Sequence, residues 1–288
     1  MFALCRMGWE MGGKLMDYPK YSVLMSVYEK ETEYNLRVSI ESMFVQTVPL
    51  DEFILVIDGP IPKGLEKEIE FQKKCHPEIK TFVLEKNVGA GLASKFGILH
   101  CSNEYVARMD SDDYSCPTRI QEEFDALFKH RVDFVGCVID EFVGSISNVV
   151  SRRILPETNE QINKYSKSRS PVAHSAVLYK KNQVLACGNY EKFRYGEDMI
   201  LFSKMLKMGC KAYNIQHPLV YMRVSENFFQ RRGGFRYFFS ITKTNLFLTF
   251  KIRWMPLGPF FLRTGCLMFS CCVPNKLRIF IYKNLLRK

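Results

Sequence analysis

Three aspartates lie within four positions of one another, directly after a short apolar segment. The segment Tyr105–Met109 has the composition of a buried strand, and Asp110, Asp112 and Asp113 follow it. Carboxylates crowded at the end of a buried strand repel one another unless a cation lies among them. Hard divalent ions such as Mg²⁺ commonly combine one or two carboxylates with the phosphates of a substrate. The cluster therefore predicts a metal and phosphate site, with an acidic turn that caps the next helix as the plainer alternative.

Two further acids begin a later helix. Glu197 and Asp198 follow Gly196, and the helical pattern runs on to Met208 with its lysines in the later turns. A helix dipole favours acids in the first turn and bases in the last. Both acids are candidates for chemistry, although stabilisation of the helix alone would also explain them.

Strands and helices alternate in the first half of the chain. Continuous apolar runs predict buried strands at residues 21–27, 53–57, 81–84, 105–109 and 134–139. Helical spacing of apolar residues predicts helices at 32–46, 65–75, 92–100 and 118–129. This order favours an α/β fold with an open, mostly parallel sheet flanked by helices. Later in the chain, strands are expected near 171–179, 212–215 and 219–224, and helices at 182–187 and 196–208.

Four polar or glycine-rich turns fall at the carboxyl ends of the first four strands. They are Tyr28-Glu29, Asp58-Gly59, Asn87–Gly91 and Asp110–Asp113. Ligands of open α/β sheets bind beyond the carboxyl ends of the strands. We therefore expect these turns to meet at one edge of the sheet and to form the binding site there.

Charge is distributed very unevenly along the 288 residues. The net charge is +11, yet residues 227–288 contain 12 lysines and arginines and no acid, which leaves 29 basic and 30 acidic residues before them. A nearly neutral body is thus followed by a wholly basic, aromatic tail. The ten cysteines show no C-x₂-C pair, so their spacing favours neither zinc nor a disulfide framework and suits a reducing compartment.

Three segments are expected from these patterns. Residues 1–19 are predicted to be a disordered extension or a non-native start, with Met16 as the natural first residue. Residues 20–226 are predicted to form the α/β domain, and residues 227–288 a helical tail.

The motifs in their order along the chain resemble family 2 glycosyltransferases with a GT-A fold. The resemblance rests on 22–28, 56–59, 87–89, 107–113, Pro171 with His174, and 196–198. It spans about residues 20 to 225 and is greatest for bacterial enzymes that build capsule, O-antigen or exopolysaccharide repeat units. Two acidic motifs in a fixed order make the resemblance specific to this family: an Asp-x-Asp motif precedes a Glu-Asp motif by about 85 residues. The fold would have a nucleotide-binding half and an acceptor half.

The resemblance implies an inverting, metal-dependent transfer of a hexose from a nucleotide sugar, most simply a UDP-sugar. Asp112 matches the metal ligand for Mg²⁺ or Mn²⁺, and Asp110 would contact the ribose or the metal. Asp113 is expected either to cap the following helix or to share in the site. Asp198 matches the general base that takes the proton of the acceptor hydroxyl. Glu197 would orient the acceptor.

Further donor and acceptor residues are implied by matching positions. Tyr28 would stack on the base, and Asp58 stands at the second of two positions where the family usually has paired aspartates, with Ile57 at the first. Asn87 belongs to the glycine-containing loop. Lys95 lies beside the position of a basic family residue, and a solvated helix lysine is an equal reading. His174 matches an acceptor-side histidine, where a structural histidine is the alternative.

The tail suggests contact with a membrane. Arg231 and Arg232 would neutralise either the donor diphosphate or lipid head groups. The apolar stretch 254–273 includes Trp254, is interrupted by prolines and has Arg263 near its middle, which disfavours a membrane-spanning helix. An interfacial segment on an anionic leaflet is expected instead, with a helical subdomain that covers the sheet as the alternative. The enzyme would then be cytoplasmic, peripheral on the inner membrane, and act on a lipid-linked or oligosaccharide acceptor.

Two rival functions belong to other classes. A nucleic-acid-binding protein would account for the basic tail, but no nucleic-acid-binding motif is visible and the basic residues alternate with apolar ones, so no nucleic-acid partner is expected. A catalytically silent GT-A scaffold of a polysaccharide assembly complex would keep the fold without the chemistry. The presence of Asp112 and Asp198 favours the enzyme.

Overall fold

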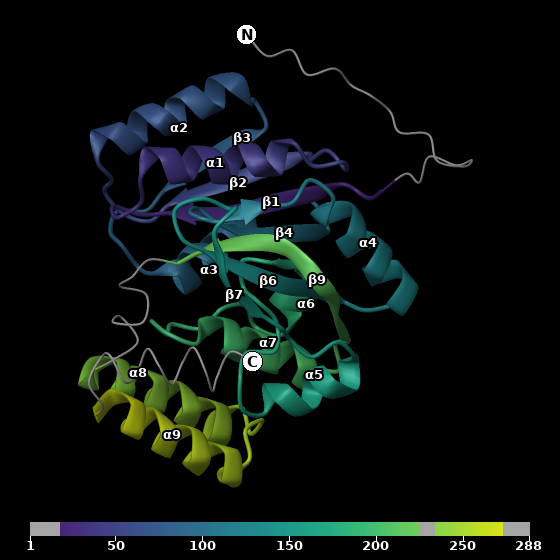
Figure 1. Ribbon diagram of the computed structural model, residues 1–288, viewed down its shortest axis with the longest axis vertical. Helices are drawn as coiled ribbons and strands as arrows, with labels where there is room; N and C mark the ends of the chain where they lie inside the picture. The colour runs from purple at the N-terminus through teal and green to yellow at the C-terminus, as the bar shows by residue number, and fades with distance from the viewer. Residues whose placement is uncertain (1–17, 225–233, 273–288) are drawn as a thin grey trace.

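The computed structural model describes residues 18–224 and 234–272 (Figure 1). Within these residues nine strands form one sheet in the order β3-β2-β1-β4-β8-β6-β9-β5, with β7 paired to β6. The strands are β1 (Tyr21–Val27), β2 (Glu52–Ile57), β3 (Ile79–Val83), β4 (Tyr105–Asp110), β5 (Tyr114–Ser115), β6 (Phe134–Phe142), β7 (Val149–Arg153), β8 (Val177–Lys180) and β9 (Ala212–Arg223).

The first half is a parallel sheet between two helical layers. β1, β2, β3 and β4 pair in parallel. Three helices pack on one face, α1 (Glu33–Phe44), α2 (Lys63–Cys75) and α4 (Arg119–His130), while α3 (Ala90–His100) packs on the other. Successive strand residues alternate between the layers: Val23 and Met25 join the first core and Leu24 the second. Burial on both faces explains the continuous apolar runs of these strands.

The second half departs from the simple alternation. The predicted strand at 134–139 is present as β6, but it does not lie beside β4, because β8 is inserted between them and runs antiparallel to both. The sheet is therefore mixed. An apolar run indicates a strand, but it does not specify which strand becomes its neighbour.

One bent strand replaces the two predicted at 212–215 and 219–224. β9 pairs with β6 throughout, but Ile215 pairs with Cys137 and Pro218 with the next residue, so Gln216 and His217 bulge out of the ladder. Pro218 has no N–H to donate to a ladder, and a bulge is where a sheet tolerates it. The residues between the two predicted strands therefore form a bulge within one strand and do not form a turn.

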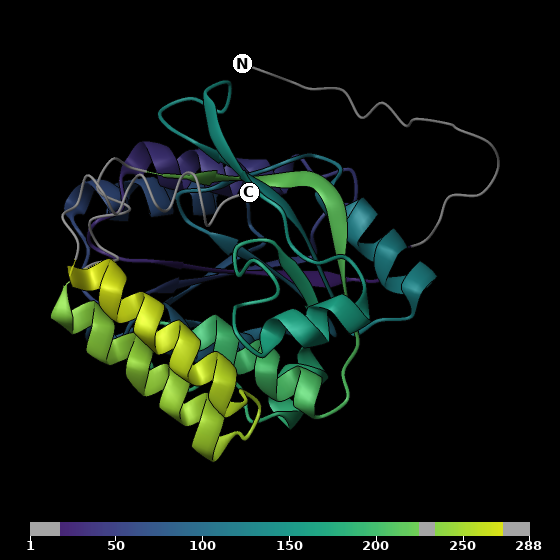
Figure 2. The ribbon, with the colours of Figure 1, turned by 60° about the horizontal axis from the view of Figure 1, so that its bottom comes forward.

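Five helical segments complete the described chain. They are α5 (Asn159–Ser166), α6 (Lys181–Ala186), α7 (Glu197–Lys207), α8 (Phe235–Leu246), which continues into a π-helical turn (Phe247–Lys251), and α9 (Leu257–Cys272). α8 and α9 lie side by side along the edge of the molecule, next to α7 (Figure 2). Of the described helices, none is long and apolar enough to cross a membrane.

The described part of the predicted tail packs against the body of the protein. Leu248, Met255 and Phe260 form a small core with Met199 and Ile200 of α7. Trp254, predicted to lie at a membrane interface, points inward instead: its ring nitrogen donates to the Ser166 hydroxyl at 3.0 Å. Arg263 likewise donates to the Ser168 carbonyl at 2.8 Å. The predicted N-terminal extension falls almost entirely outside the described residues.

Candidate active site

The predicted carboxylate turn lies at the carboxyl edge of β4. Asp110 ends the strand, and the Ser39 hydroxyl donates to its carbonyl oxygen at 2.6 Å. The Ser111 hydroxyl donates to Glu31 Oε2 at 3.0 Å, which brings an acid from the end of the β1 segment against the turn. Glu31 was not among the predicted site residues. Its place after β1, which pairs with β4, is the signal that could have identified it.

Asp113 does not cap a helix, which corrects one of the two predicted roles. It is buried, and its Oδ1 accepts the backbone N–H of Arg223 at 2.9 Å. The Ser175 hydroxyl also bonds to it. The N-cap of α4 is Thr118. Burial and the neighbouring Asp112 and Asp110 raise the pKa of Asp113 well above its usual range. Asp113 therefore fastens the turn to the end of β9.

Arg223 is the basic residue of this turn. Besides its backbone bond to Asp113, its Nε donates to the Asp112 carbonyl at 3.0 Å and its Nη1 to the Gly144 carbonyl at 2.9 Å. Sequence reasoning missed Arg223, although its position at the end of the last strand was visible. The predicted Arg231 and Arg232 lie outside the described residues.

Asp112 is partly buried and lies among like charges. Burial, followed by the charges of Asp110 and Glu31, raises its pKa to about 7, and Arg223 opposes this shift. A group of carboxylates that resists ionisation is stabilised by a cation. Oxygen donors on Asp112 and Asp110 suit Mg²⁺ or Mn²⁺, which also take phosphate oxygens from a substrate. Within the two described ranges, no three His, Cys, Asp or Glu side chains converge on one point, so substrate oxygens would have to complete such a site.

A buried arginine lies beneath the turn. Arg108, in β4, is 2% exposed and forms an ion pair with Asp110. Its charge also acts on Glu197, lowering the pKa of that carboxyl, and on His174. Arg108 therefore connects the carboxylate turn electrostatically with the predicted catalytic acids. Its place two residues before Asp110 on a strand that is otherwise apolar up to that aspartate was the available signal.

The two predicted catalytic acids begin α7, as expected. Their N-cap, Gly196, has φ +80°, and a Cβ there would lie 2.8 Å from Thr244 Cγ2 of α8. The Thr244 hydroxyl donates to the Tyr195 carbonyl at 2.7 Å. Glycine thus lets α8 press directly on this corner. Asp198 Oδ2 accepts the hydroxyl hydrogen of Ser170 at 2.7 Å, so Ser170 orients the carboxylate.

Glu197 is held mainly in its protonated form near neutral pH. Burial, followed by the charge of Asp198, raises its pKa to about 8. The Asp110 charge raises it further and Arg108 lowers it. A carboxylic acid that keeps its proton can donate a hydrogen bond, which an ionised carboxylate cannot do. Glu197 is therefore suited to act as a hydrogen-bond donor.

His174 lies on the segment that leads into β8. Its Nε2 is 2.8 Å from the hydroxyl of buried Tyr190. Burial and the nearby Arg108 charge hold the pKa of His174 well below its usual range, so the ring is neutral. Because β8 begins opposite Arg108, the residues before it lie at the same edge as the carboxylate turn.

On the donor side, Asp58 organises a loop. It is 4% exposed, and its two oxygens accept the backbone N–H groups of Val88 at 2.7 Å and Gly89 at 2.9 Å. Asn87 Nδ2 donates to the Asp58 carbonyl at 3.2 Å. A Cβ on Gly59, whose φ is +88°, would lie 2.5 Å from the Asn87 nitrogen, so only glycine fits there. Asp58 would therefore act on a donor through the Asn87–Gly89 loop.

Tyr28 and Lys95 are the remaining predicted donor residues in the described part of the chain. Tyr28 follows β1 directly and is partly exposed at the carboxyl edge. Lys95 lies in α3, and its carbonyl accepts from Asn189 Nδ2 at 3.2 Å. The charge of Asp110 acts on both Asp112 and Glu197, and that of Asp198 acts on Glu197, so these four predicted residues form one electrostatic group.

Known proteins resemble the chain in sequence and in fold. A family model described as "Glycosyl transferase family 2" matches residues 22–185. An Escherichia coli UDP-Gal:alpha-D-GlcNAc-diphosphoundecaprenol beta-1,3-galactosyltransferase is 34% identical over 94% of this chain and 98% of its own length. The amylovoran biosynthesis glycosyltransferase AmsE of Erwinia amylovora is 31% identical over 75% of this chain and 81% of its own.

A solved structure shares the fold across nearly the whole chain. It is the mannosyltransferase PcManGT from Pyrobaculum calidifontis, in complex with GDP-Man and Mn²⁺. It superposes with a TM-score of 0.62 at 16% identity, and the match covers 95% of this chain and 76% of that one. This likeness confirms the predicted GT-A fold.

Replacing Arg108 should destabilise the protein. In Arg108→Met, Asp110 loses its buried partner, and we expect the free energy of unfolding to fall by about 3 kcal/mol in urea denaturation. Arg194→Met, at an exposed arginine, is the matched control and should change it by less than about 0.5 kcal/mol. Equal stability of the two variants would contradict the role assigned to Arg108.

Glu197→Gln should stabilise the protein in a pH-dependent way. The folded protein keeps this proton up to about pH 8, whereas the unfolded chain releases it near the ordinary value of 4.5. Raising the pH between these values therefore favours unfolding. We expect the variant to gain roughly 1–3 kcal/mol at pH 7.5 and nothing at pH 4. Glu160→Gln, in the exposed first turn of α5, should show no such difference; a gain independent of pH for Glu197→Gln would refute the shift.

Proposed function

Because the chain belongs to glycosyl transferase family 2, we propose that it is an inverting, metal-dependent hexosyltransferase that uses a nucleotide sugar. The donor we propose is a UDP-sugar, and the acceptor a lipid-linked saccharide in the assembly of a bacterial surface polysaccharide. One observation carries the proposal: Asp112 and Asp110 lie in the same electrostatic group as the Glu197-Asp198 pair. The proposed leaving-group site and the proposed proton acceptor would then lie at one edge of the sheet.

The donor is proposed to lie across the ends of β1, β2 and β4. Tyr28 would offer an aromatic face to the base, and the Asn87–Gly89 loop would approach through its backbone. The diphosphate would lie toward Asp112, beside Arg223. Lys95, and Arg231 and Arg232 from outside the described residues, are proposed as further basic residues for the donor. The choice of a UDP-sugar is supported by the name of the Escherichia coli relative, which specifies UDP-Gal.

Asp112 and Asp110 would hold Mg²⁺ or Mn²⁺. When bound, the ion would offset the negative charge that develops on the leaving diphosphate. The clustered carboxylates support this assignment, as does the Mn²⁺ named for the mannosyltransferase. Arg108 would keep Asp110 in place through their buried ion pair.

Asp198 is proposed to be the general base. The acceptor hydroxyl oxygen would attack the anomeric carbon on the face opposite the diphosphate, and Asp198 would take its proton. The bond from the anomeric carbon to the diphosphate oxygen breaks in the same displacement, which turns an α-linked donor into a β-linked product. The bond from Ser170 holds one oxygen of Asp198. Protonated Glu197 and neutral His174 would orient the acceptor.

The acceptor and the location are inferred from the name of a relative and from the cysteines. The name of the Escherichia coli relative specifies a sugar diphosphate on undecaprenol, which supports a lipid-linked acceptor here. The seven cysteines whose side chains are described, Cys75, Cys101, Cys116, Cys137, Cys187, Cys210 and Cys266, are free thiols, which supports a reducing compartment. We therefore place the reaction at the cytoplasmic face of the inner membrane, with the enzyme bound peripherally.

Asp198→Asn tests the base. The amide cannot take a proton, so we expect kcat for release of nucleoside diphosphate to fall by roughly 10²-fold or more. Donor affinity, measured by calorimetry, should stay within about twofold of the wild type. Glu160→Gln, an exposed acid in a first helical turn, should leave both values unchanged. Loss of donor affinity with kcat retained would count against the assignment, and wild-type protein inactive with every sugar nucleotide would favour a silent scaffold.

Asp112→Ala tests the metal. Wild-type turnover should rise with added Mg²⁺ or Mn²⁺ and be lost with a chelator, whereas the variant should show at most a few per cent of that activity at any metal concentration. Glu85→Ala removes an exposed acid that follows β3 and is expected to behave like the wild type. Full turnover by Asp112→Ala would exclude Asp112 as a ligand.

A further inference from the structure

The side of the α8–α9 hairpin that faces away from the body is unusually apolar. We call this side the outer face. Its large apolar side chains are between 42% and 72% exposed, and they are Phe235, Phe239, Leu246, Phe250, Leu257, Phe261, Leu262, Met268 and Phe269. A soluble protein rarely leaves so many large apolar groups together on its surface unless a partner covers them.

The pattern of α8 and its π-helical continuation shows that their part of the outer face lies on one side of the helix. Along α8 and its π-helical continuation, exposed Phe239, Leu246 and Phe250 alternate with buried Ile241 and Leu248 at helical spacing. Such spacing places the two sets on opposite sides of the helix. One side therefore belongs to the core with α7, and the other is left for a partner.

Contacts of the inner side keep the outer face turned outward. The Thr244 hydroxyl bonds to the Tyr195 carbonyl, the Trp254 ring nitrogen to Ser166, and Arg263 to the Ser168 carbonyl. Lys207 of α7 donates to the Ile252 carbonyl. These bonds tie both helices and the turn between them to α7 and to residues 166–168. The hairpin cannot bury its outer face on the body without breaking them.

Charge indicates what kind of partner fits. Four exposed basic residues, Arg236, Lys243, Lys251 and Arg253, alternate in sequence with the apolar residues of the hairpin, and the Lys243 ammonium also lies 5.6 Å from the ring centroid of Phe193. Residues 227–288 contain 12 lysines and arginines and no acid. Apolar side chains interleaved with cations, without any acid, match an anionic phospholipid surface, in which acyl chains lie beneath phosphate head groups.

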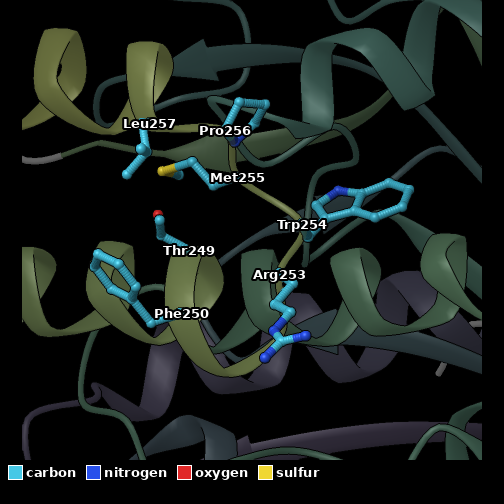
Figure 3. Close-up of a pocket in the computed structure, with 7 residues that line it drawn as sticks. All are labelled: Thr249, Phe250, Arg253, Trp254, Met255, Pro256 and Leu257. Carbon is cyan, nitrogen blue, oxygen red and sulfur yellow. The ribbon is translucent and has the colours of Figure 1, made fainter.

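The turn of the hairpin adds a concave feature to this surface. A pocket of about 320 Å³ is lined only by residues 249–257 and by none of the predicted catalytic or donor residues. Figure 3 shows Thr249, Phe250, Met255 and Leu257 grouped together, with Arg253 in the loop between the two helices. Phe250 and Leu257 belong to both the pocket and the outer face, so a lipid at that face would meet apolar walls and a nearby guanidinium.

We propose that the outer face of the α8–α9 hairpin docks on an anionic phospholipid bilayer. The inner side of the same helix, through Thr244, presses on Gly196 beside the Glu197-Asp198 pair. Docking would therefore hold the acid pair at a set position relative to the lipid surface. Docking can be measured without donor or acceptor, so its outcome can be separated from that of the proposed reaction.

Flotation of the full chain with vesicles tests the proposal. We expect it to bind vesicles of phosphatidylglycerol and phosphatidylcholine at least about tenfold more tightly than vesicles of phosphatidylcholine alone. Phe239→Ser with Phe261→Ser should reduce binding to the anionic vesicles by about tenfold or more. Lys243→Glu with Lys251→Glu should reduce the preference for anionic vesicles. Thermal unfolding followed by circular dichroism would confirm that each variant remains folded.

The matched control replaces exposed aromatic residues elsewhere. Tyr34→Ser with Phe71→Ser, on α1 and α2, should bind vesicles as the wild type does. The proposal is overturned if the wild type does not bind anionic vesicles, or if the Phe239/Phe261 variant binds them equally well. It is also overturned if ultracentrifugation shows that this variant loses self-association while the wild type ignores vesicles. That result would make the outer face an interface between copies of the chain.

Discussion

Buried negative charge at one edge of the sheet is the constraint on which the rest of the site depends. Burial raises the pKa values of Asp112 and Glu197, and the charge of Asp110 raises both further. Two arginines offset this charge, Arg108 from beneath the turn and Arg223 from the end of β9. The balance is incomplete within the protein, and a divalent cation would complete it. The same unfavourable crowding that weakens the fold there is what would attract the metal and its diphosphate.

The topology of the sheet brings the acceptor-side residues to this edge. β8 runs antiparallel to β4, so the segment that precedes β8 returns to the edge at which β4 ends. That segment contains Ser170 and His174, which contact Asp198 and Tyr190. A parallel strand in the same position would have placed them at the opposite edge. β9 runs parallel to β6 and ends at the same side, which brings Arg223 to the carboxylate turn.

The α8–α9 hairpin connects the site with the surface of the molecule. Its inner side packs on α7, and Thr244 holds the corner at Gly196, from which the Glu197-Asp198 pair projects. Its outer face offers aromatic and basic residues to a partner. If both proposals hold, one rigid element positions the general base and the lipid surface together. A lipid-linked acceptor would then already lie close to Asp198 in a suitable orientation. This proximity would favour the reaction.

The sequence by itself determined the local elements and the identity of the charged groups. Apolar runs identified the buried strands, Asp110–Asp113 and Glu197-Asp198 were recognisable as ordered acidic motifs, and the basic tail was a matter of composition. Only the tertiary structure decided that Arg108 is buried against Asp110, that Asp113 bonds to a residue 110 positions away rather than capping a helix, and that Trp254 turns inward. The physical reason is that periodicity and composition report on neighbours along the chain. Burial of a charge, the direction of an inserted strand and the inner side of a surface helix are set by contacts between segments that are distant in sequence.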